Sequence, residues 1–251
     1  MALVTIADSS TAIAIAAAER VTTLIEASIQ ARSSALVCLP GGRTPEGLYA
    51  LLADDRRPWR HRIDWLRVYL FWGDERHVQP DHPDSNFGMA HRALVSRVPI
   101  PPGQVYRIEG EREDARDAAT AYDATLRQGL IAAGRTDRSF DVALLGIGTD
   151  AHIASIFPGS PAVDERSLRV AAAWVPHLQA WRITLTPPAL LDSRHIVVLA
   201  SGEEKADAVR AALVLPEDPS TWPAQLLRPA GDRVEWIIDG AASRSLAAPP
   251  A

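Results

Sequence analysis

Short apolar runs alternate with longer mixed stretches along most of the chain. The apolar runs favour buried β-strands and span residues 35–39, 66–72, 140–145, 182–185, 195–200 and 234–238. The stretches between them favour helices, chiefly over residues 45–52, 85–96, 113–133 and 203–213. Thr44 before Pro45, and Ser201-Gly202 before Glu203, provide helix start signals. This alternation predicts the α/β class and a three-layer αβα sandwich around a mostly parallel sheet.

The first thirty residues resemble an export signal only in part. Residues 11–18 are rich in Ala and Ile, but Asp8 precedes them and the first arginine, Arg20, follows them. Apolar residues recur at helical spacing at Ile13, Ala17, Val21, Leu24 and Ile25. Ser9 or Ser10 is placed to cap a helix there. We therefore expect an amphipathic helix, and a soluble protein, because no other segment approaches the ~18 apolar residues of a membrane span.

Two stretches rich in Pro and Gly, residues 98–103 and 215–231, interrupt the pattern and predict loops. The second contains Trp222, Leu226 and Leu227, so it is expected to pack on the body of the protein or to fold over a site. Neither stretch has the composition of a flexible linker. We expect one domain over residues 1–246, followed by a frayed tail of Ala and Pro at 247–251.

Composition narrows the classes of partner. The formal net charge is −5, the pI is about 5.8, and Lys and Arg are dispersed, which argues against a nucleic-acid partner. The single cysteine, Cys38, allows no intrachain disulfide and fits a reducing cytoplasm. The seven histidines show no spacing typical of a metal site. We expect no metal, and either a monomer or a weak homo-oligomer.

A glycine pair separates the first predicted buried strand from the helix after it. Gly41 and Gly42 allow the backbone to approach a ligand closely, and Arg43 and Thr44 follow at the start of the helix. Free N–H groups at a helix start, together with the helix dipole, favour an anion such as phosphate. The alternative is an ordinary tight turn with a good cap.

Charged residues crowd the end of the next strand, at Asp74, Glu75 and Arg76, and Asn86 follows. Open α/β sheets place ligands outside the carboxyl ends of their strands, so Asp74 and Arg76 are candidates to position a polyol and its developing negative charge. The alternative is a solvated loop with an internal pair between Glu75 and Arg76, which would contribute little energy.

The segment from Gly146 to Phe157 follows a third apolar strand. Its Gly146, Gly148 and Ala151 match a dinucleotide-binding fingerprint, but Pro158 interrupts the chain too soon for the helix that such a site requires. Histidine titrates near neutrality, so His152 is a candidate general base, and Asp150 would orient its ring or contact the substrate. The alternative is a capping aspartate beside a structural histidine.

Two further cationic residues are placed where they could contact the same anionic ligand. Arg182 lies in a predicted strand, and Lys205 lies in the first turn of a predicted helix. Both are candidates to complete a phosphate site with the glycine loop. A surface charge is the alternative for each residue taken alone.

Taken in order, these motifs resemble the 6-phosphogluconolactonases. The resemblance covers residues 40–45, 73–76, 85–86, 145–158, 182–186, 202–205, 222–226 and 236–239. It implies a modified Rossmann-like αβα sandwich shared with sugar-phosphate isomerases. It also implies hydrolysis of 6-phosphogluconolactone to 6-phosphogluconate without metal or organic cofactor.

The resemblance assigns roles to the candidates. His152 would deprotonate the attacking water, Arg76 would stabilise the oxyanion, and Asp74 and Asp150 would complete the catalytic set. The phosphate and polyol would be held by Gly41, Gly42, Arg43, Thr44, Asn86, Arg182 and Lys205.

Three positions depart from the family pattern. Arg43 stands where Ser is usual, Ala151 where Gly is usual, and Ile153 where Thr is frequent. Ala151 matters most, because alanine costs ~1 kcal/mol or more wherever the backbone requires a positive φ, and a shift there would displace His152. Arg43 is expected to add a phosphate contact.

Two other functions fit part of the pattern. A glucosamine-6-phosphate deaminase or isomerase shares the motif around His152, but that family resembles Asp-Glu-Tyr where this chain has Asp74, Glu75 and Arg76, and Asn-Glu-Pro where it has Ser155 to Pro158. A non-catalytic sugar-phosphate sensor is the other alternative. The absence of a basic patch and of an added DNA-binding segment argues against a stand-alone regulator.

Overall fold

The buried apolar runs form one seven-stranded sheet in the computed structural model, which describes residues 2–135 and 140–246. Its strand order is β1-β10-β9-β6-β2-β3-β5, and all neighbouring pairs are parallel. The strands are β1 (Leu3–Ala7), β2 (Ala35–Leu39), β3 (Val68–Trp72), β5 (Val105–Tyr106), β6 (Val142–Gly146), β9 (His195–Ala200) and β10 (Val234–Asp239).

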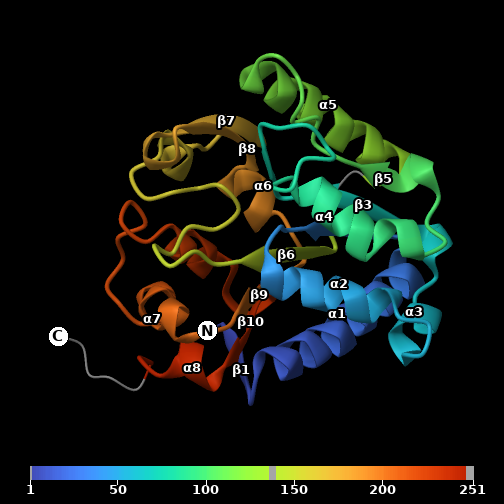
Figure 1. Ribbon diagram of the computed structural model, residues 1–251, viewed down its shortest axis with the longest axis horizontal. Helices are drawn as coiled ribbons and strands as arrows, with labels where there is room; N and C mark the ends of the chain where they lie inside the picture. The colour runs from blue at the N-terminus through green and yellow to red at the C-terminus, as the bar shows by residue number, and fades with distance from the viewer. Residues whose placement is uncertain (1, 136–139, 247–251) are drawn as a thin grey trace.

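Helices flank this sheet, which confirms the expected three-layer α/β sandwich (Figure 1). They are α1 (Ser10–Arg32), α2 (Arg43–Ala53), α3 (Pro58–Arg62), α4 (Asn86–Ala93), α5 (Ala115–Ala132), α6 (Pro187–Leu191), α7 (Ala206–Leu213) and α8 (Gly240–Ser243). Helices α1 and α2 lie side by side against the sheet. No helix in the described part of the chain has both the length and the apolar character needed to cross a membrane.

Local sequence explains the main elements. Strand β2 is buried along its whole length, as expected for an uninterrupted apolar run in a sheet covered on both faces. Ser9 caps α1, as predicted: its hydroxyl accepts a hydrogen bond from the N–H of Ala12 at 3.1 Å. The apolar stripe of α1 then faces the core at Ile13, Ala17, Val21, Leu24 and Ile25.

A second, antiparallel sheet has the order β4-β8-β7, with β4 (Asp74–Arg76), β8 (Ala180–Leu185) and β7 (Val170–Val175). It contains the strand predicted at 182–185. Gly73 connects the two sheets, because its N–H donates to Leu39 O at 3.0 Å and its carbonyl accepts from the N–H of Leu185 at 2.8 Å. This connection places β4 at the carboxyl ends of the central strands.

Several boundaries differ from the sequence prediction. The strand expected from residue 66 begins at Val68, and the helix expected over 85–96 ends at Ala93. Strands β1, β4, β5 and β7 were not predicted. Strand β1 is an edge strand with no fully buried residue, β4 is entirely charged, β5 has two residues, and β7 is rich in alanine, which disfavours strands.

The predicted loop at 215–231 is partly helical, since 3₁₀ turns occupy Pro223–Arg233. It packs on the body of the protein, which was one of the two expected arrangements. The side-chain amide of Gln225 donates to Ala211 O and Pro216 O, and Ala224 N donates to Ala151 O at 2.9 Å. The segment therefore supports the loop that carries His152. The predicted tail at 247–251 lies outside the described residues.

Candidate active site

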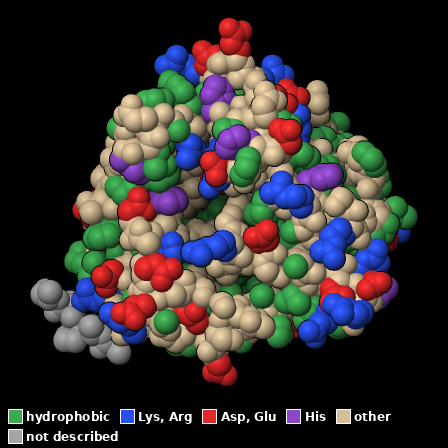
Figure 2. Space-filling view, in the orientation of Figure 1, with side chains coloured by type: hydrophobic (Ala, Val, Ile, Leu, Met, Phe, Trp, Pro, Cys, Tyr) green, Lys and Arg blue, Asp and Glu red, His purple; other side chains and the backbone are tan. Residues whose placement is uncertain are grey.

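A hollow of about 250 Å³ lies at the carboxyl ends of β2, β6 and β9, beside β4. All the candidate residues except Asp150 and Arg182 line it: Gly41, Gly42, Arg43, Thr44, Asp74, Arg76, Asn86, His152 and Lys205. Figure 2 shows a hollow near the middle of the visible face, bordered by basic, acidic and histidine side chains. The fold thus brings together residues that are up to 164 positions apart in sequence, from Gly41 to Lys205.

The loop that contains Gly41 and Gly42 leaves room for the side chain of Asn86. Gly42 has a φ of 103° and is the N-cap of α2, so the helix begins at Arg43, two residues before the predicted start at Pro45, and Thr44 is not its cap. A Cβ atom on Gly41 would lie 1.8 Å from Oδ1 of Asn86. The buried Asn86 side chain therefore requires glycine at position 41, whether or not a ligand also approaches the backbone there.

His152 is fixed in one orientation. Its Nδ1 lies 2.6 Å from Oδ1 of Asp150, and its ring centroid lies 4.3 Å from that of Phe157. Because Asp150 accepts only, we assign the proton of the neutral ring to Nδ1, which leaves the lone pair on Nε2. This arrangement is that of an oriented general base.

The carboxyl group of Asp150 is half-buried, and burial acts to raise its pKa. The hydrogen bonds and charge of His152 act in the opposite direction and outweigh this effect of burial. The pKa of Asp150 therefore falls from 3.8 to about 2. A carboxyl whose pKa is lowered on folding stabilises the folded state above its unfolded pKa. This contribution of Asp150 is therefore present above pH 3.8 and is lost as the pH falls through about 2.

Gly148 leaves room for this pair. A Cβ atom on Gly148 would lie 2.0 Å from Nδ1 of His152 and 2.4 Å from Oδ1 of Asp150, whereas one on Gly146 would meet nothing within 4 Å. We therefore expect Gly148→Ala to displace the imidazole and to lower kcat by about 10²-fold, which is within the range that general-base catalysis contributes. Gly146→Ala is the matched control and should keep most of the activity. Equal activities for the two variants, measured by steady-state kinetics, would contradict this role of Gly148.

Ala151 does adopt the backbone conformation that favours glycine, with a φ of 61°. Its N–H donates to Gly148 O at 3.1 Å, its carbonyl accepts from Ala224, and the residue is fully buried. The conformation costs alanine about 1–2 kcal/mol, but its buried methyl returns about 0.8 kcal/mol. Ile153 is also buried, so its aliphatic side chain fills the core beneath the loop.

Asp74 is a buried carboxylate that is held on both oxygens. Ser155 Oγ donates to Oδ2 at 2.6 Å, and the Asn86 side-chain amide donates to Oδ1 at 3.2 Å. Ser155 in turn receives support from β8, because its N–H donates to Thr184 Oγ1 at 3.1 Å. Ser155 was not among the predicted site residues, although it lies only three residues after His152.

Glu75 does not form the ion pair with Arg76 that the alternative interpretation required. It is buried and accepts from the N–H of Asn86 at 2.7 Å and of Phe87 at 2.8 Å, at the start of α4. Burial is the main cause of its raised pKa, which these hydrogen bonds oppose. Glu75 is therefore structural. The Arg76 guanidinium donates to the Asp84 carbonyl and has no carboxylate partner among the described residues.

Four cations lie at the hollow or next to it. Arg76 and Arg182 face each other across β4 and β8, and burial together with the charge of Arg76 lowers the pKa of Arg182. Burial is also the main cause of the lowered pKa of Lys205, to which Arg43 adds. Among the described residues, none of the four has a carboxylate within ion-pair distance. Like charges placed opposite each other destabilise a sheet, so this gathering favours an anionic ligand.

Three residues near Lys205 were not among the predicted site residues, namely Ser201, Glu204 and Asp239. Ser201 and Glu204 line the hollow, and Ser201 Oγ donates to Asp239 Oδ2 at 2.6 Å. Asp239 also accepts from the N–H of Gly202, whose φ is 100°. Asp239 therefore shapes the turn before Lys205 from a distance of more than thirty residues in sequence, which no local motif reveals.

The site offers little to a metal or a dinucleotide. Over residues 2–135 and 140–246, no group of three His, Cys, Asp or Glu side chains is arranged to hold a metal ion. After β6, the next helical element is the 3₁₀ turn at Pro161–Asp164, so the Gly146 fingerprint opens no dinucleotide-binding helix. The hollow instead combines an oriented histidine with cations that form no ion pair in the part of the chain that the structure describes.

The sandwich and its hollow are those of an α/β protein with a candidate anion-binding site at the carboxyl ends of its central strands. The family model described as glucosamine-6-phosphate isomerases/6-phosphogluconolactonase matches residues 8–236. The 6-phosphogluconolactonase of Streptomyces coelicolor is 37% identical over 242 residues, which cover 92% of this chain and 89% of that protein. The chain belongs to the glucosamine-6-phosphate isomerase/6-phosphogluconolactonase family.

Solved structures show the same fold. The 6-phosphogluconolactonase of Trypanosoma brucei matches with a TM-score of 0.82 and 28% identity, covering 98% of this chain and 99% of that one. A monomeric glucosamine-6-phosphate deaminase matches with a TM-score of 0.79 and 23% identity, covering 97% and 99%. The fold alone therefore does not separate the two reactions, and the site residues must do so.

Proposed function

We propose that this protein hydrolyses 6-phosphogluconolactone to 6-phosphogluconate, a step of the pentose phosphate pathway. The observation that carries the proposal is His152, oriented by Asp150, in a hollow that is also lined by Arg43, Arg76 and Lys205. The similarity to the 6-phosphogluconolactonase of Streptomyces coelicolor, at 37% identity, supports the same substrate here.

In this mechanism His152 acts as general base. Its Nε2 takes a proton from a water molecule, which attacks the lactone carbonyl carbon. Arg76 stabilises the negative charge that develops on the carbonyl oxygen. The bond between the carbonyl carbon and the ring oxygen then breaks, and the imidazolium returns the proton to the released oxygen. The products are a carboxylic acid and a hydroxyl group, which together contain the atoms of lactone and water.

The phosphate group would occupy the side of the hollow where Lys205 lies close to Arg43, the first residue of α2. Two cations and a helix start suit a phosphate dianion. Gly41, Gly42 and Thr44 would border it, and Arg182 would complete it by turning in from beside Arg76. Asp74, with Asn86 behind it, would accept a hydrogen bond from a substrate hydroxyl. Binding at the phosphate end would hold the lactone carbonyl beside His152.

Asp150 would orient His152 and stabilise the imidazolium that forms during turnover. We therefore expect Asp150→Asn to lower kcat by about 10²-fold, because the imidazolium loses a carboxylate partner 2.6 Å away. Steady-state kinetics measure the effect. A kcat equal to that of the wild type would show that Asp150 does not act through His152.

A comparison of three substrates tests the reaction. The protein should hydrolyse 6-phosphogluconolactone much faster than gluconolactone without phosphate, and should not release ammonia from glucosamine 6-phosphate. Ammonia release would assign the chain to the deaminase branch instead. Equal rates on the two lactones would remove the phosphate site from the proposal, and no turnover of any of the three would leave a non-catalytic sugar-phosphate sensor.

We further propose that the enzyme works in the cytoplasm, without metal or organic cofactor, as a monomer or weak homo-oligomer. The unpaired and fully buried Cys38 supports a reducing compartment. The net charge of −5 supports the absence of a nucleic-acid partner.

A further inference from the structure

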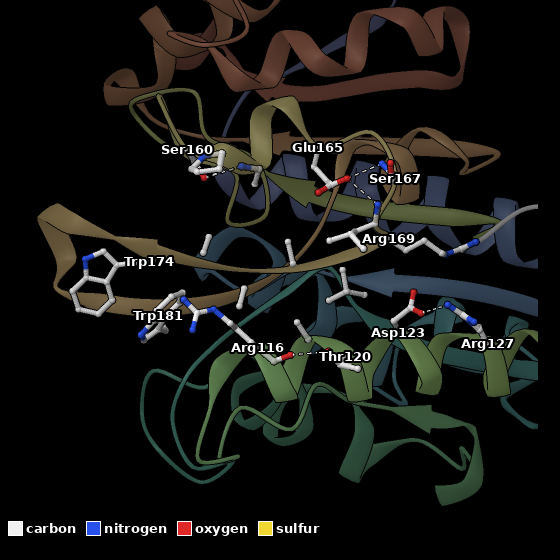
Figure 3. Close-up of a pocket in the computed structure, with 18 residues that line it drawn as sticks. Arg116, Thr120, Asp123, Arg127, Ser160, Glu165, Ser167, Arg169, Trp174 and Trp181 are labelled. Atoms are coloured by element: carbon white, nitrogen blue, oxygen red, sulfur yellow. Dashed lines mark hydrogen bonds and ion pairs between the residues drawn. The ribbon is translucent and has the colours of Figure 1, made fainter.

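A second cavity of about 730 Å³ lies between α5 and residues 160–168, and it shares no lining residue with the hollow at His152. Figure 3 shows strand β7 running between its two walls, with Arg116, Thr120 and Asp123 on the α5 side and Ser160 and Glu165 on the other. The proposed lactonase reaction does not use this groove.

The groove follows the edge of β7. It is lined by every residue from Val170 to Trp174. Successive side chains of a strand point to opposite faces of the sheet, so a cavity that meets all of them wraps around the strand edge. Strand β7 pairs with β8 and with no other strand among the described residues. The groove therefore opens onto an unpaired strand edge.

The hydrogen bonds of β8 show which groups of β7 face the groove. Leu185 N donates to Gly73 O on the β4 side, and Thr186 N donates to Arg169 O on the β7 side. Hydrogen-bonded and non-bonded pairs alternate in an antiparallel ladder, and Leu185 is opposite Val170. The N–H and C=O groups of Val170, Ala172 and Trp174 therefore point away from β8, and no other part of the described chain pairs with them.

This edge lacks the usual protection. Proteins commonly block edge strands with charges, proline or a bulge, yet Val170–Val175 contains no charged residue and no proline. The three alanines at 171–173 leave the backbone accessible. Because the groove is bounded by α5 and by residues 160–168, a single extended chain suits it better than the folded edge of a second copy.

The unsatisfied charge in the groove is positive. The Arg116 guanidinium lies 5.1 Å from the Trp181 ring centroid, and no carboxylate among the described residues lies within ion-pair distance of it. The acidic groups are already engaged: Asp123 pairs with Arg127, and Glu165 accepts from the N–H of Ser167 at 2.6 Å. A carboxylate on the occupant would thus complement Arg116.

We propose that this groove binds an extended segment of a partner polypeptide. The segment adds to β7 as a fourth strand of the β4-β8-β7 sheet and places an acidic side chain on Arg116. Strand addition gives affinity through the main-chain groups of Val170, Ala172 and Trp174. The proposal is independent of the lactonase reaction, because its site and its readout are separate.

The test begins with a random library of displayed 12-residue peptides, selected on the full-length protein. Enriched peptides are then synthesised, and their Kd values are measured on the wild type and three variants. Ala172→Pro removes an outward N–H without removing a bond to β8, and should weaken binding at least tenfold. Ala172→Val keeps that N–H and serves as the matched control. Arg116→Ala should weaken binding about fivefold or more and should abolish the preference for an acidic residue in the peptide.

Two further measurements keep the outcome decisive. Amide hydrogen exchange should slow at Ala172 and Trp174 when peptide binds. If Ala172→Pro fails to fold, judged by its circular dichroism spectrum and Tm, peptides N-methylated at alternate residues replace it and should bind the wild type at least tenfold more weakly. Failure to enrich any peptide, equal binding to Ala172→Pro and Ala172→Val, or no effect of N-methylation would overturn the proposal.

Discussion

Replacing His152 with alanine is expected to lower kcat for 6-phosphogluconolactone by about 10³-fold, because a positioned general base contributes about 10²–10⁴-fold. The ring is held by Asp150 at 2.6 Å and by Phe157 at a centroid distance of 4.3 Å, so its loss removes an oriented base rather than a mobile side chain. Steady-state kinetics, corrected for spontaneous opening of the lactone, measure the effect.

His177 provides the matched control for this substitution. Its ring also packs against Phe157, with a centroid distance of 5.5 Å, and it does not line the hollow. His177→Ala should retain most of the activity, and both variants should keep the wild-type Tm within a few degrees. A His152→Ala protein with more than a tenth of wild-type activity would show that another group takes the proton.

Replacing Lys205 with methionine is expected to raise KM for 6-phosphogluconolactone by about 10–100-fold. The reason is that a hydrogen bond to a charged group contributes about 1.5–3 kcal/mol. Methionine preserves much of the apolar stem of this half-buried side chain, so the change removes mainly the charge. The same variant should leave kcat/KM for unphosphorylated gluconolactone nearly unchanged, because that substrate has no phosphate to bind.

The two lactones make this experiment specific to the phosphate. An equal loss on both substrates would mean that Lys205 supports the fold of the hollow or the reacting end of the substrate. Arg43→Ser, which restores the residue usual in the family, should produce a smaller change in the same direction, since Lys205 and the start of α2 remain.

The sequence predicted the layers of the fold because parallel strands buried on both faces appear as continuous apolar runs. Residues 35–39 are the best example, since β2 has those same bounds and no exposed residue. Strand β7 was missed for the opposite reason: its three alanines carry little β propensity, and its order comes from pairing with β8. Tertiary pairing of that kind leaves no local signal.

The candidate site was predictable in its members and less so in its internal contacts. Glycines and charged residues at strand ends indicated the rim of the hollow, because the carboxyl ends of parallel strands meet at one edge. The burial of Glu75 under α4 was not predictable, since a charged residue next to Arg76 resembles an exposed ion pair. The place of Arg182 beside Arg76 depends on the pairing of β4 with β8, which the sequence did not reveal.

The most direct test of the account is the initial rate of hydrolysis of freshly generated 6-phosphogluconolactone at near-neutral pH, with the protein treated with EDTA. We expect turnover far above the spontaneous background and unaffected by the chelator, because the proposed mechanism uses His152 and Arg76 without a metal. A rate equal to the spontaneous background would contradict the proposed function, and a rate abolished by EDTA would contradict the proposed mechanism.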